Sequence, residues 1–254
     1  MGNRWHSMVG RTIGYISLAP CTQRLVNAER SFCLITSRGL SGHRRTMKLY
    51  AEYLFPRLMD WMMSGETFQR LRADLLKDAR GNVLEIGYGT ALNLPHYPAA
   101  ITHLTLVDPA RLLRSKVRQR TAQAAFPVTV EEQPAESLSF PDRHFDSVVS
   151  TWTLCTISDP ERALREIGRV LKPDGLFLFL EHGRSDDRNI AVWQDRLNPI
   201  QRVAACGCNV NRRIDQLIEK SGLRLVRLRR FHMSGVPRVI GEMFQGECVR
   251  GNGG

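Results

Sequence analysis

The stretch from Asn82 to Pro95 joins a short apolar strand to a glycine turn, and it constrains the fold of this chain strongly. It reads Asn-Val-Leu-Glu-Ile-Gly-Tyr-Gly-Thr-Ala-Leu-Asn-Leu-Pro. Val83–Ile86 has the length of a buried strand, and Thr90 leads into helix-compatible Ala91 and Leu92. Glycines at the carboxyl end of a strand let the backbone turn sharply and approach a ligand. The pattern predicts an open α/β sheet with a ligand site at this end of the strand.

Glu85, just before the glycines, narrows the choice of ligand. A carboxylate there would repel a pyrophosphate, but it can accept hydrogen bonds from a ligand's ammonium group. The dinucleotide pattern Gly-x-Gly-x-x-Gly is also not met, because position 92 is Leu. A nicotinamide-dependent oxidoreductase is therefore disfavoured.

Strand and helix patterns alternate along the rest of the chain. This alternation predicts a largely parallel sheet, and the last two strands can form a hairpin-like edge. We therefore expect an α/β, Rossmann-like, seven-stranded sheet, mostly parallel with the last strand antiparallel, and helices on both faces. The expected strands are Val83–Ile86, Leu104–Val107, Val128–Val130, Asp146–Ser150 (within Phe145–Thr151), Leu176–Leu180 (after a turn at Pro173–Gly175), Leu223–Phe231 and Phe244–Val249.

The helices are predicted from apolar periodicity and from capping residues. Leu49–Met62 and Thr67–Lys77 precede the first strand, and the proline in the middle of the former should kink or divide it. Asp159 and Pro160 suit the N-cap and first position of a later helix. After the fifth strand we expect a long loop, up to a helix over Val210–Ile218.

Residues 1–46 differ from the rest, since they hold seven arginines and a single acid. Such a start resembles an organellar transit peptide; a disordered extension or an upstream start codon are the alternatives. We expect a poorly ordered extension over 1–46 and one catalytic domain over 47–254, with residues 1–40 dispensable for folding and cofactor binding. Much of the net charge of +11 belongs to this arm, so it is weak evidence for nucleic-acid binding, and no specific nucleic-acid partner is expected.

Six cysteines in 254 residues are too sparse for a disulfide framework. Cys206-x-Cys208 is half of a metal-site pattern, but no second Cys/His pair with ligand spacing accompanies it, so no metal is expected. No apolar run approaches the roughly 18 residues of a membrane-spanning helix. These features favour a reducing, cytoplasmic location, with organellar targeting by the N-terminal arm as the alternative.

Glu85-Ile86-Gly87-Tyr88-Gly89-Thr90-Ala91 resembles the first motif of the class I S-adenosylmethionine-dependent methyltransferases, acid-x-Gly-x-Gly-x-Gly. Ala91 replaces the third glycine. The resemblance implies S-adenosylmethionine as the cofactor, bound by Glu85, Gly87 and Gly89. It also implies that the helix around Trp61 is a lid over the cofactor pocket, although an aromatic-rich helix can instead lie on a membrane surface.

Further cofactor-binding residues follow the later strands. Asp108 stands 21 residues after Gly87, at the place where an acid accepts hydrogen bonds from ribose hydroxyls. By resemblance, Ala135 and Glu136 line the adenine, although the family acid often stands two positions earlier, where this chain has a proline. Thr151 ends the fourth strand at the same sheet edge, and we expect it at the methionine end of the cofactor.

His182 is the candidate catalytic residue, because a histidine after the fifth strand can deprotonate an acceptor near neutral pH. A hydrogen-bonded loop histidine is the alternative. Cys155 is interpreted as a small buried residue, since methyl transfer from a sulfonium needs no enzyme nucleophile. The donor is already activated, so catalysis consists mostly of alignment.

A narrower resemblance is to the methyltransferase-like thiol methyltransferases and their bacterial relatives. It rests on Ser150–Cys155, Leu180-Glu181-His182, Trp193-Gln194 and Gly207-Cys208-Asn209 with Arg212. It implies a methyltransferase for a small-molecule acceptor, with a thiol as one candidate. The alternatives are a phospholipid amine or a quinone-like lipid as acceptor, or a cofactor-binding protein without activity.

Overall fold

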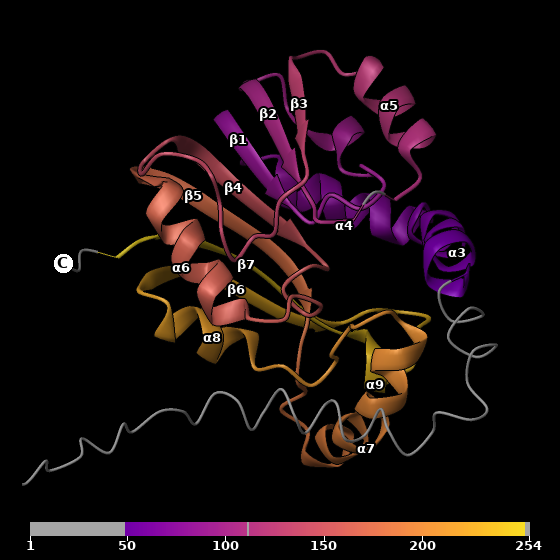
Figure 1. The fold of residues 1–254 in the computed structure, drawn as a ribbon. Helices are drawn as coiled ribbons and strands as arrows, with labels where there is room; N and C mark the ends of the chain where they lie inside the picture. Colours follow the sequence, from indigo (N-terminus) through magenta and orange to yellow (C-terminus); the bar gives the residue numbers. More distant parts are fainter. Residues whose placement is uncertain (1–48, 111, 252–254) are drawn as a thin grey trace, which may run out of the picture. The chain divides into compact units, whose positions relative to one another are not determined.

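The protein is described by a computed structural model over residues 49–110 and 112–251. The expectations for residues 1–46 lie outside this part of the chain. Figure 1 shows the sheet with its helices.

The sheet has seven strands in the order β3-β2-β1-β4-β5-β7-β6. The first five pair in parallel, and β7 runs antiparallel to both β5 and β6. The predicted fold class is therefore confirmed. The strands are β1 Gly81–Ile86, β2 Ile101–Val107, β3 Val128–Glu131, β4 Phe145–Thr151, β5 Leu171–His182, β6 Leu223–His232 and β7 Glu242–Arg250.

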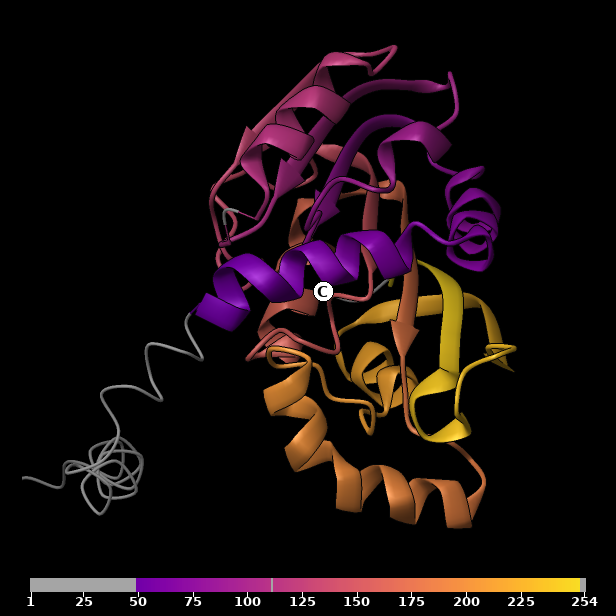
Figure 2. The same cartoon turned by 90° about the vertical axis from the view of Figure 1, so that its right-hand side faces the viewer.

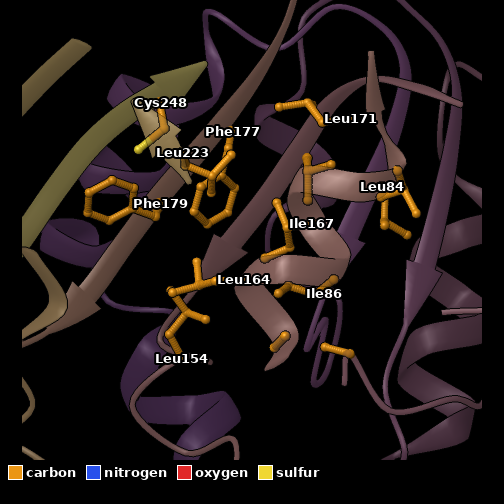
Figure 3. Packing of buried hydrophobic residues seen from close by; sticks show 14 of the residues in the cluster. Leu84, Ile86, Leu154, Leu164, Ile167, Leu171, Phe177, Phe179, Leu223 and Cys248 are labelled. Carbon is orange, nitrogen blue, oxygen red and sulfur yellow. The ribbon is translucent and has the colours of Figure 1, made fainter. Parts of the chain in front are cut away.

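Helices cover both faces of the sheet. On one face α6 and α8 meet β4 and β5 in a core that includes Leu164, Ile167, Phe177 and Phe179, all fully buried; Figure 3 shows this packing. On the other face α4 and α5 pack over Val149 and the neighbouring strands. The helices are α3 Phe55–Met63, α4 Glu66–Leu76, α5 Arg114–Ala122, α6 Pro160–Val170, α7 Arg188–Ala204, α8 Ile214–Lys220 and α9 Arg238–Gly241.

The α6 helix begins as its sequence predicts. The Asp159 carboxylate accepts a hydrogen bond from the Arg162 N–H at 2.9 Å, and Pro160 occupies the first turn. This cap satisfies one backbone donor that the helix itself leaves unpaired.

Residues 50–63 form one continuous helical rod, which Figure 2 shows from the side, and α4 follows it after a turn at Ser64 and Gly65. A π-helical turn, η1 over Tyr50–Leu54, passes directly into α3. Pro56 stands in the first turn of α3, directly after the π-helical turn, and it has no N–H to donate to the carbonyls of that turn. The proline thus marks the boundary between two helix types and does not break the rod.

Three local expectations were wrong. Ala91 and Leu92 do not begin a helix; turns lead to a short 3-10 helix, η2 over Leu94–His96, because Ala91 takes a left-handed φ of 61°. The expected turn at 173–175 is an irregularity within β5, where Leu171 pairs with Phe145 and Leu176 already with Ser147. The long loop after β5 contains the 17-residue helix α7.

Across residues 49–110 and 112–251, no helix is both long and apolar enough to cross a membrane.

Candidate active site

The glycine turn after β1 is shaped by a close approach of the β4 end. Gly87 and Gly89 have φ values of 66° and 54°, a region that L-residues rarely adopt. A Cβ on Gly87 would lie 2.1 Å from the Thr153 side chain, whereas a Cβ on Gly89 would meet nothing within 4 Å. Gly87 is therefore required by contact and conformation, and Gly89 by conformation alone.

A cavity opens where this turn, the end of β4 and the α3–α4 segment meet. It brings together four of the predicted cofactor residues, Glu85, Gly87, Gly89 and Thr151. The α3 helix covers it, as expected for a lid. The remaining lining residues are Phe55, Pro56, Met59, Asp60, Met63, Arg72, Tyr88, Thr90, Leu92, Asn93, Leu112 and Trp152.

Glu85 is 2% exposed and accepts two hydrogen bonds at the floor of the cavity. Its Oε1 accepts from Asn93 Nδ2 at 3.0 Å, and its Oε2 accepts from the Tyr97 hydroxyl at 2.7 Å. Burial raises the pKa of Glu85 to about 7, although both hydrogen bonds and the charge of Arg72 oppose this rise. The carboxylate is therefore held half-ionised near neutral pH, and a cation beside it would favour the charged form.

Three polar atoms of residues that line this cavity are buried without a hydrogen-bond partner among the described residues: Asn93 Oδ1, Arg72 Nε and Trp152 Nε1. Asn93 already donates to Glu85 and to Thr151 Oγ1 at 3.0 Å, and Arg72 donates to the Met63 carbonyl at 2.8 Å. The unpaired acceptor, Asn93 Oδ1, suits an ammonium group, and the unpaired cationic donor, Arg72 Nε, suits a carboxylate. Both groups occur in the methionine part of S-adenosylmethionine, so the cavity fits this cofactor.

Asp108 ends β2 next to the glycine turn. Its Oδ2 accepts from the Gly89 N–H at 3.1 Å, and its Oδ1 accepts from the Ala110 N–H at 2.8 Å. Burial raises the pKa of Asp108, and the two backbone donors oppose that rise. The carboxylate thus braces the glycine turn. Asp108 itself is not among the residues that line the cavity, so its ribose-binding role stays a prediction.

Ala135 and Glu136 do not line the cavity. Ala135 is buried in the core below the β3 end, and Glu136 Oε1 accepts a long hydrogen bond of 3.4 Å from the Asp159 N–H. Their adenine-binding role therefore stays a prediction.

Asp60 fastens the lid helix to the body of the domain. It is 3% exposed and pairs with Lys116 and with Arg120, whose Nη1 lies 2.7 Å away. Burial raises the pKa of Asp60, but the hydrogen bonds from Arg120 and Lys116 outweigh it, so the pKa falls to about 2. Arg120 also donates to the Thr90 carbonyl, which couples the lid to the glycine turn.

Glu181, fully buried at the end of β5, organises the loop after β4. It accepts from the Ser150 hydroxyl at 2.7 Å and from the backbone N–H groups of Thr153 and Leu154, each at 3.0 Å. The pKa of Glu181 is raised by burial, yet all of these partners are donors, so the carboxylate acts as an acceptor. This contact fixes the segment that carries Thr151 and Trp152 into the cavity.

His182, the predicted base, lies at the next position of β5 but outside the residues that line the cavity. Its Nδ1 is 3.7 Å from Cys208 Sγ, and Cys208 Sγ is 3.5 Å from Cys155 Sγ. The catalytic role of His182 therefore stays a prediction.

Several site residues were missed at the sequence level: Arg72, Asn93, Tyr97 and Asp60. Asn93 and Tyr97 lie in a Pro-rich loop without periodicity, and Arg72 and Asp60 lie on helices where charged residues are usually exposed. For Asp60 and Arg72, the only signal in the sequence was a charged residue on the apolar face of an amphipathic helix, which is weak evidence for a site.

Comparison with known proteins agrees with this geometry. Residues 84–179 match a family model described as a methyltransferase domain. The chain is 29% identical over 170 residues to human "Thiol S-methyltransferase TMT1A", and the aligned region covers 65% of this chain and 68% of that protein. It is 29% identical over 160 residues to "Phosphatidylethanolamine N-methyltransferase" of Cereibacter sphaeroides, and this aligned region covers 62% of the chain and 76% of that protein.

The fold also matches solved structures. One is the N-methyltransferase NodS from Bradyrhizobium japonicum WM9 in complex with S-adenosyl-L-homocysteine, with a TM-score of 0.57 and 15% identity over 75% of this chain and 91% of that chain. The chain belongs to the class I S-adenosylmethionine-dependent methyltransferases. It is an enzyme of this class, and S-adenosylmethionine is its cofactor.

Proposed function

We propose that this methyltransferase acts on a small lipophilic molecule and that the acceptor atom is a thiol sulfur. The cofactor, when bound, supplies an electrophilic methyl group. The chain's own part is to hold the cofactor with Glu85, Asn93, Arg72 and Asp108, and to align the acceptor under the lid.

The observation that carries this proposal is the state of the titratable groups in the cavity. Asp60 is ion-paired, Arg72 is a cation, and both Glu85 oxygens accept hydrogen bonds. Burial raises the pKa of Tyr88, so its phenol is a poor proton acceptor at neutral pH. Glu85 has a pKa of about 7, but its two oxygens already accept hydrogen bonds and face the ammonium group of the cofactor. Among the described lining residues, no side chain is therefore left to act as a general base on the acceptor.

This arrangement favours a thiol over an amine. A thiol with a pKa of about 8.5 is already a few per cent thiolate at pH 7, whereas an amine with a pKa of about 10.4 is almost fully protonated. The apolar wall formed by Phe55, Met59 and Met63 suits a lipophilic acceptor. Similarity to a protein named as a thiol S-methyltransferase supports the same choice.

A phospholipid amine or a quinol is the second candidate. Its support is a set of exposed apolar side chains, which are Leu54, Leu58 and Trp61 on the η1–α3 rod and Trp193 and Ile200 on α7. The Tyr50 hydroxyl donates to the Ala204 carbonyl at 2.7 Å, which holds the rod against the end of α7. Such a surface suits docking on lipid.

The experiment is a methyl-transfer assay on the full chain with three kinds of acceptor. A panel of aliphatic and aromatic thiols is compared with phosphatidylethanolamine vesicles and a quinol, and S-adenosylhomocysteine release is measured. We expect turnover with thiols that follows the thiolate fraction as the pH rises from 6 to 9. Activity on the vesicles or the quinol, with none on any thiol, would move the assignment to the second candidate.

The base hypothesis for His182 is tested in the same assay. If His182 deprotonates the acceptor, His182→Ala lowers kcat and leaves cofactor affinity unchanged, and acceptors of low pKa lose less activity than those of high pKa. An equal loss for all acceptors would contradict that role.

A further inference from the structure

Three soft ligand side chains from distant segments meet at the carboxyl edge of the sheet. Cys155 follows β4, His182 ends β5, and Cys208 follows α7. The two sulfur atoms and an imidazole nitrogen all lie within 4.8 Å of one another. Cys155 and Cys208 are buried and His182 is half-buried.

The spacing of these atoms fits the edges of a metal coordination tetrahedron. Zn–S bonds of about 2.3 Å and Zn–N bonds of about 2.05 Å require S···S and S···N separations of roughly 3.8 and 3.5 Å. Two of the three observed separations match, with 3.5 Å between the sulfurs and 3.7 Å between Cys208 Sγ and His182 Nδ1. The third, between Cys155 Sγ and the imidazole, is within 4.8 Å. An ion can therefore be placed among them with small side-chain movements.

The charges around the group also suit a divalent cation. Binding of a metal ion would release the protons of both thiols to solvent. The two thiolates and the Glu181 carboxylate would then carry three negative charges, and the Arg212 guanidinium, which donates to the Leu154 carbonyl, carries one positive charge. A dication would bring the sum to zero in a largely buried setting. Thiolate and imidazole donors select zinc over the hard cations magnesium and calcium.

The segments that carry the ligands are held in place without the ion. Asn209 binds the Cys155 carbonyl twice, through its backbone N–H at 2.9 Å and its Nδ2 at 3.0 Å. Glu181 accepts from the Cys155 N–H at 3.3 Å. This second layer of hydrogen bonds orients the donors, as outer partners do in known metal sites.

We propose that Cys155, His182 and Cys208 bind one zinc ion, with a fourth position left to water or another exogenous ligand. Three protein ligands are typical of zinc sites that keep a position open, and among the described residues no fourth His, Cys, Asp or Glu belongs to the group. The sequence alone did not predict this site. Of the three proposed ligands only Cys208 belongs to a metal-like pair, Cys206-x-Cys208, and the other member of that pair is not a ligand.

A zinc ion here would tie the loop after β4 to the α7–α8 connection. That loop begins at Thr151 and Trp152, which line the cofactor cavity. A coordinated His182 is not free to act as a base, so this inference and the base hypothesis exclude each other. The proposed function requires neither.

The test is zinc binding by the full chain, purified without a histidine tag, reduced, and stripped with a chelator. Zn²⁺ is titrated against a chromophoric chelator, and Co²⁺ serves as an optical probe of tetrahedral thiolate ligation. We expect one tight equivalent per chain. Cys155→Ser, Cys208→Ser and His182→Gln should each weaken binding by more than the roughly 10–100-fold typical of losing an outer-layer partner.

Cys206→Ser is the matched control, because Cys206 lies two residues from Cys208 but outside the group. It should bind Zn²⁺ as the wild type does, and S-adenosylhomocysteine binding by each variant checks its fold. If the cysteine variants do not fold, His182→Gln and the wild-type stoichiometry decide.

Three results would overturn the proposal. They are the absence of stoichiometric binding, equal affinity in Cys206→Ser and all three ligand variants, and a disulfide between Cys155 and Cys208 recovered from protein purified without reductant and free of metal.

Discussion

Replacing Glu85 by glutamine should remove a pH-dependent loss of stability from the cofactor-free enzyme. Glu85 is fully enclosed, and burial raises its pKa to about 7 from an ordinary value near 4.5. Between these two values the folded state holds a proton that the unfolded chain has released. The contribution of Glu85 to the free energy of unfolding is therefore fully present below about pH 4.5 and is lost as the pH rises through about 7.

The size of this loss follows from the pKa difference. A difference of about 2.5 in pKa at roughly 1.4 kcal/mol each gives about 3.5 kcal/mol as an upper value. The substitution also removes one hydrogen bond. Asn93 and Tyr97 donate to the two oxygens of Glu85, whereas a glutamine side chain has a single acceptor oxygen. That loss is the same at every pH, so it cancels when the variant and the wild type are compared across pH.

Urea unfolding of both proteins at pH 5 and pH 8 measures the effect. The free-energy difference between Glu85→Gln and wild type should move by up to about 3.5 kcal/mol in favour of the variant at pH 8. Cofactor binding should respond in the opposite sense, because an ammonium beside Glu85 favours the ionised carboxylate. Calorimetry should show proton release on S-adenosylmethionine binding near pH 6.5 in the wild type only. Parallel stability profiles for the two proteins would refute the reasoning.

Three further predictions follow from contacts at the same edge. Asp108→Ala should weaken S-adenosylmethionine binding by roughly 10–100-fold, by losing a charge-assisted hydrogen bond of about 1.5–3 kcal/mol; unchanged calorimetric affinity in a folded variant would contradict this. Gly87→Ala should lower the melting temperature more than Gly89→Ala, because only the former meets Thr153; equal losses in thermal unfolding would show that the backbone angle alone matters. Asp60→Asn should cost about 2 kcal/mol at pH 7, and this difference should vanish as the pH falls from about 4 through 2, since the Asp60 pKa is lowered in the folded state; a constant difference in urea unfolding would argue against the ion pairs with Lys116 and Arg120.

The sheet could be predicted because its signals are local. Each strand is a short apolar run, and a run such as 176–180 is apolar at every position because both faces of β5 are covered. The positions of Glu85, Asp108 and Thr151 at one edge then follow, since parallel strands end on the same side. By contrast, the partners of Glu85 come from a loop, and only the folded chain shows that Asn93 and Tyr97 turn back to it.

Helix α7 escaped prediction because its polarity is reversed. Its buried positions are Ala191, Gln194 and Asn198, whereas Trp193 and Ile200 are 51% and 67% exposed. A search for an apolar stripe facing a core therefore finds the wrong side of this helix.

Reversed polarity gives α7 a different role from that of the other helices. Gln194 is fully buried and makes three hydrogen bonds, accepting from the Ser185 N–H and donating to the Gly183 and Val210 carbonyls. Asn198 accepts from the Val210 N–H at 3.1 Å. Apolar contacts would hold the helix with less directional preference, whereas these bonds set where the chain around Val210 must lie. Because Cys208 is only two residues away, the polar inner face of α7 helps to bring its sulfur to Cys155 and His182.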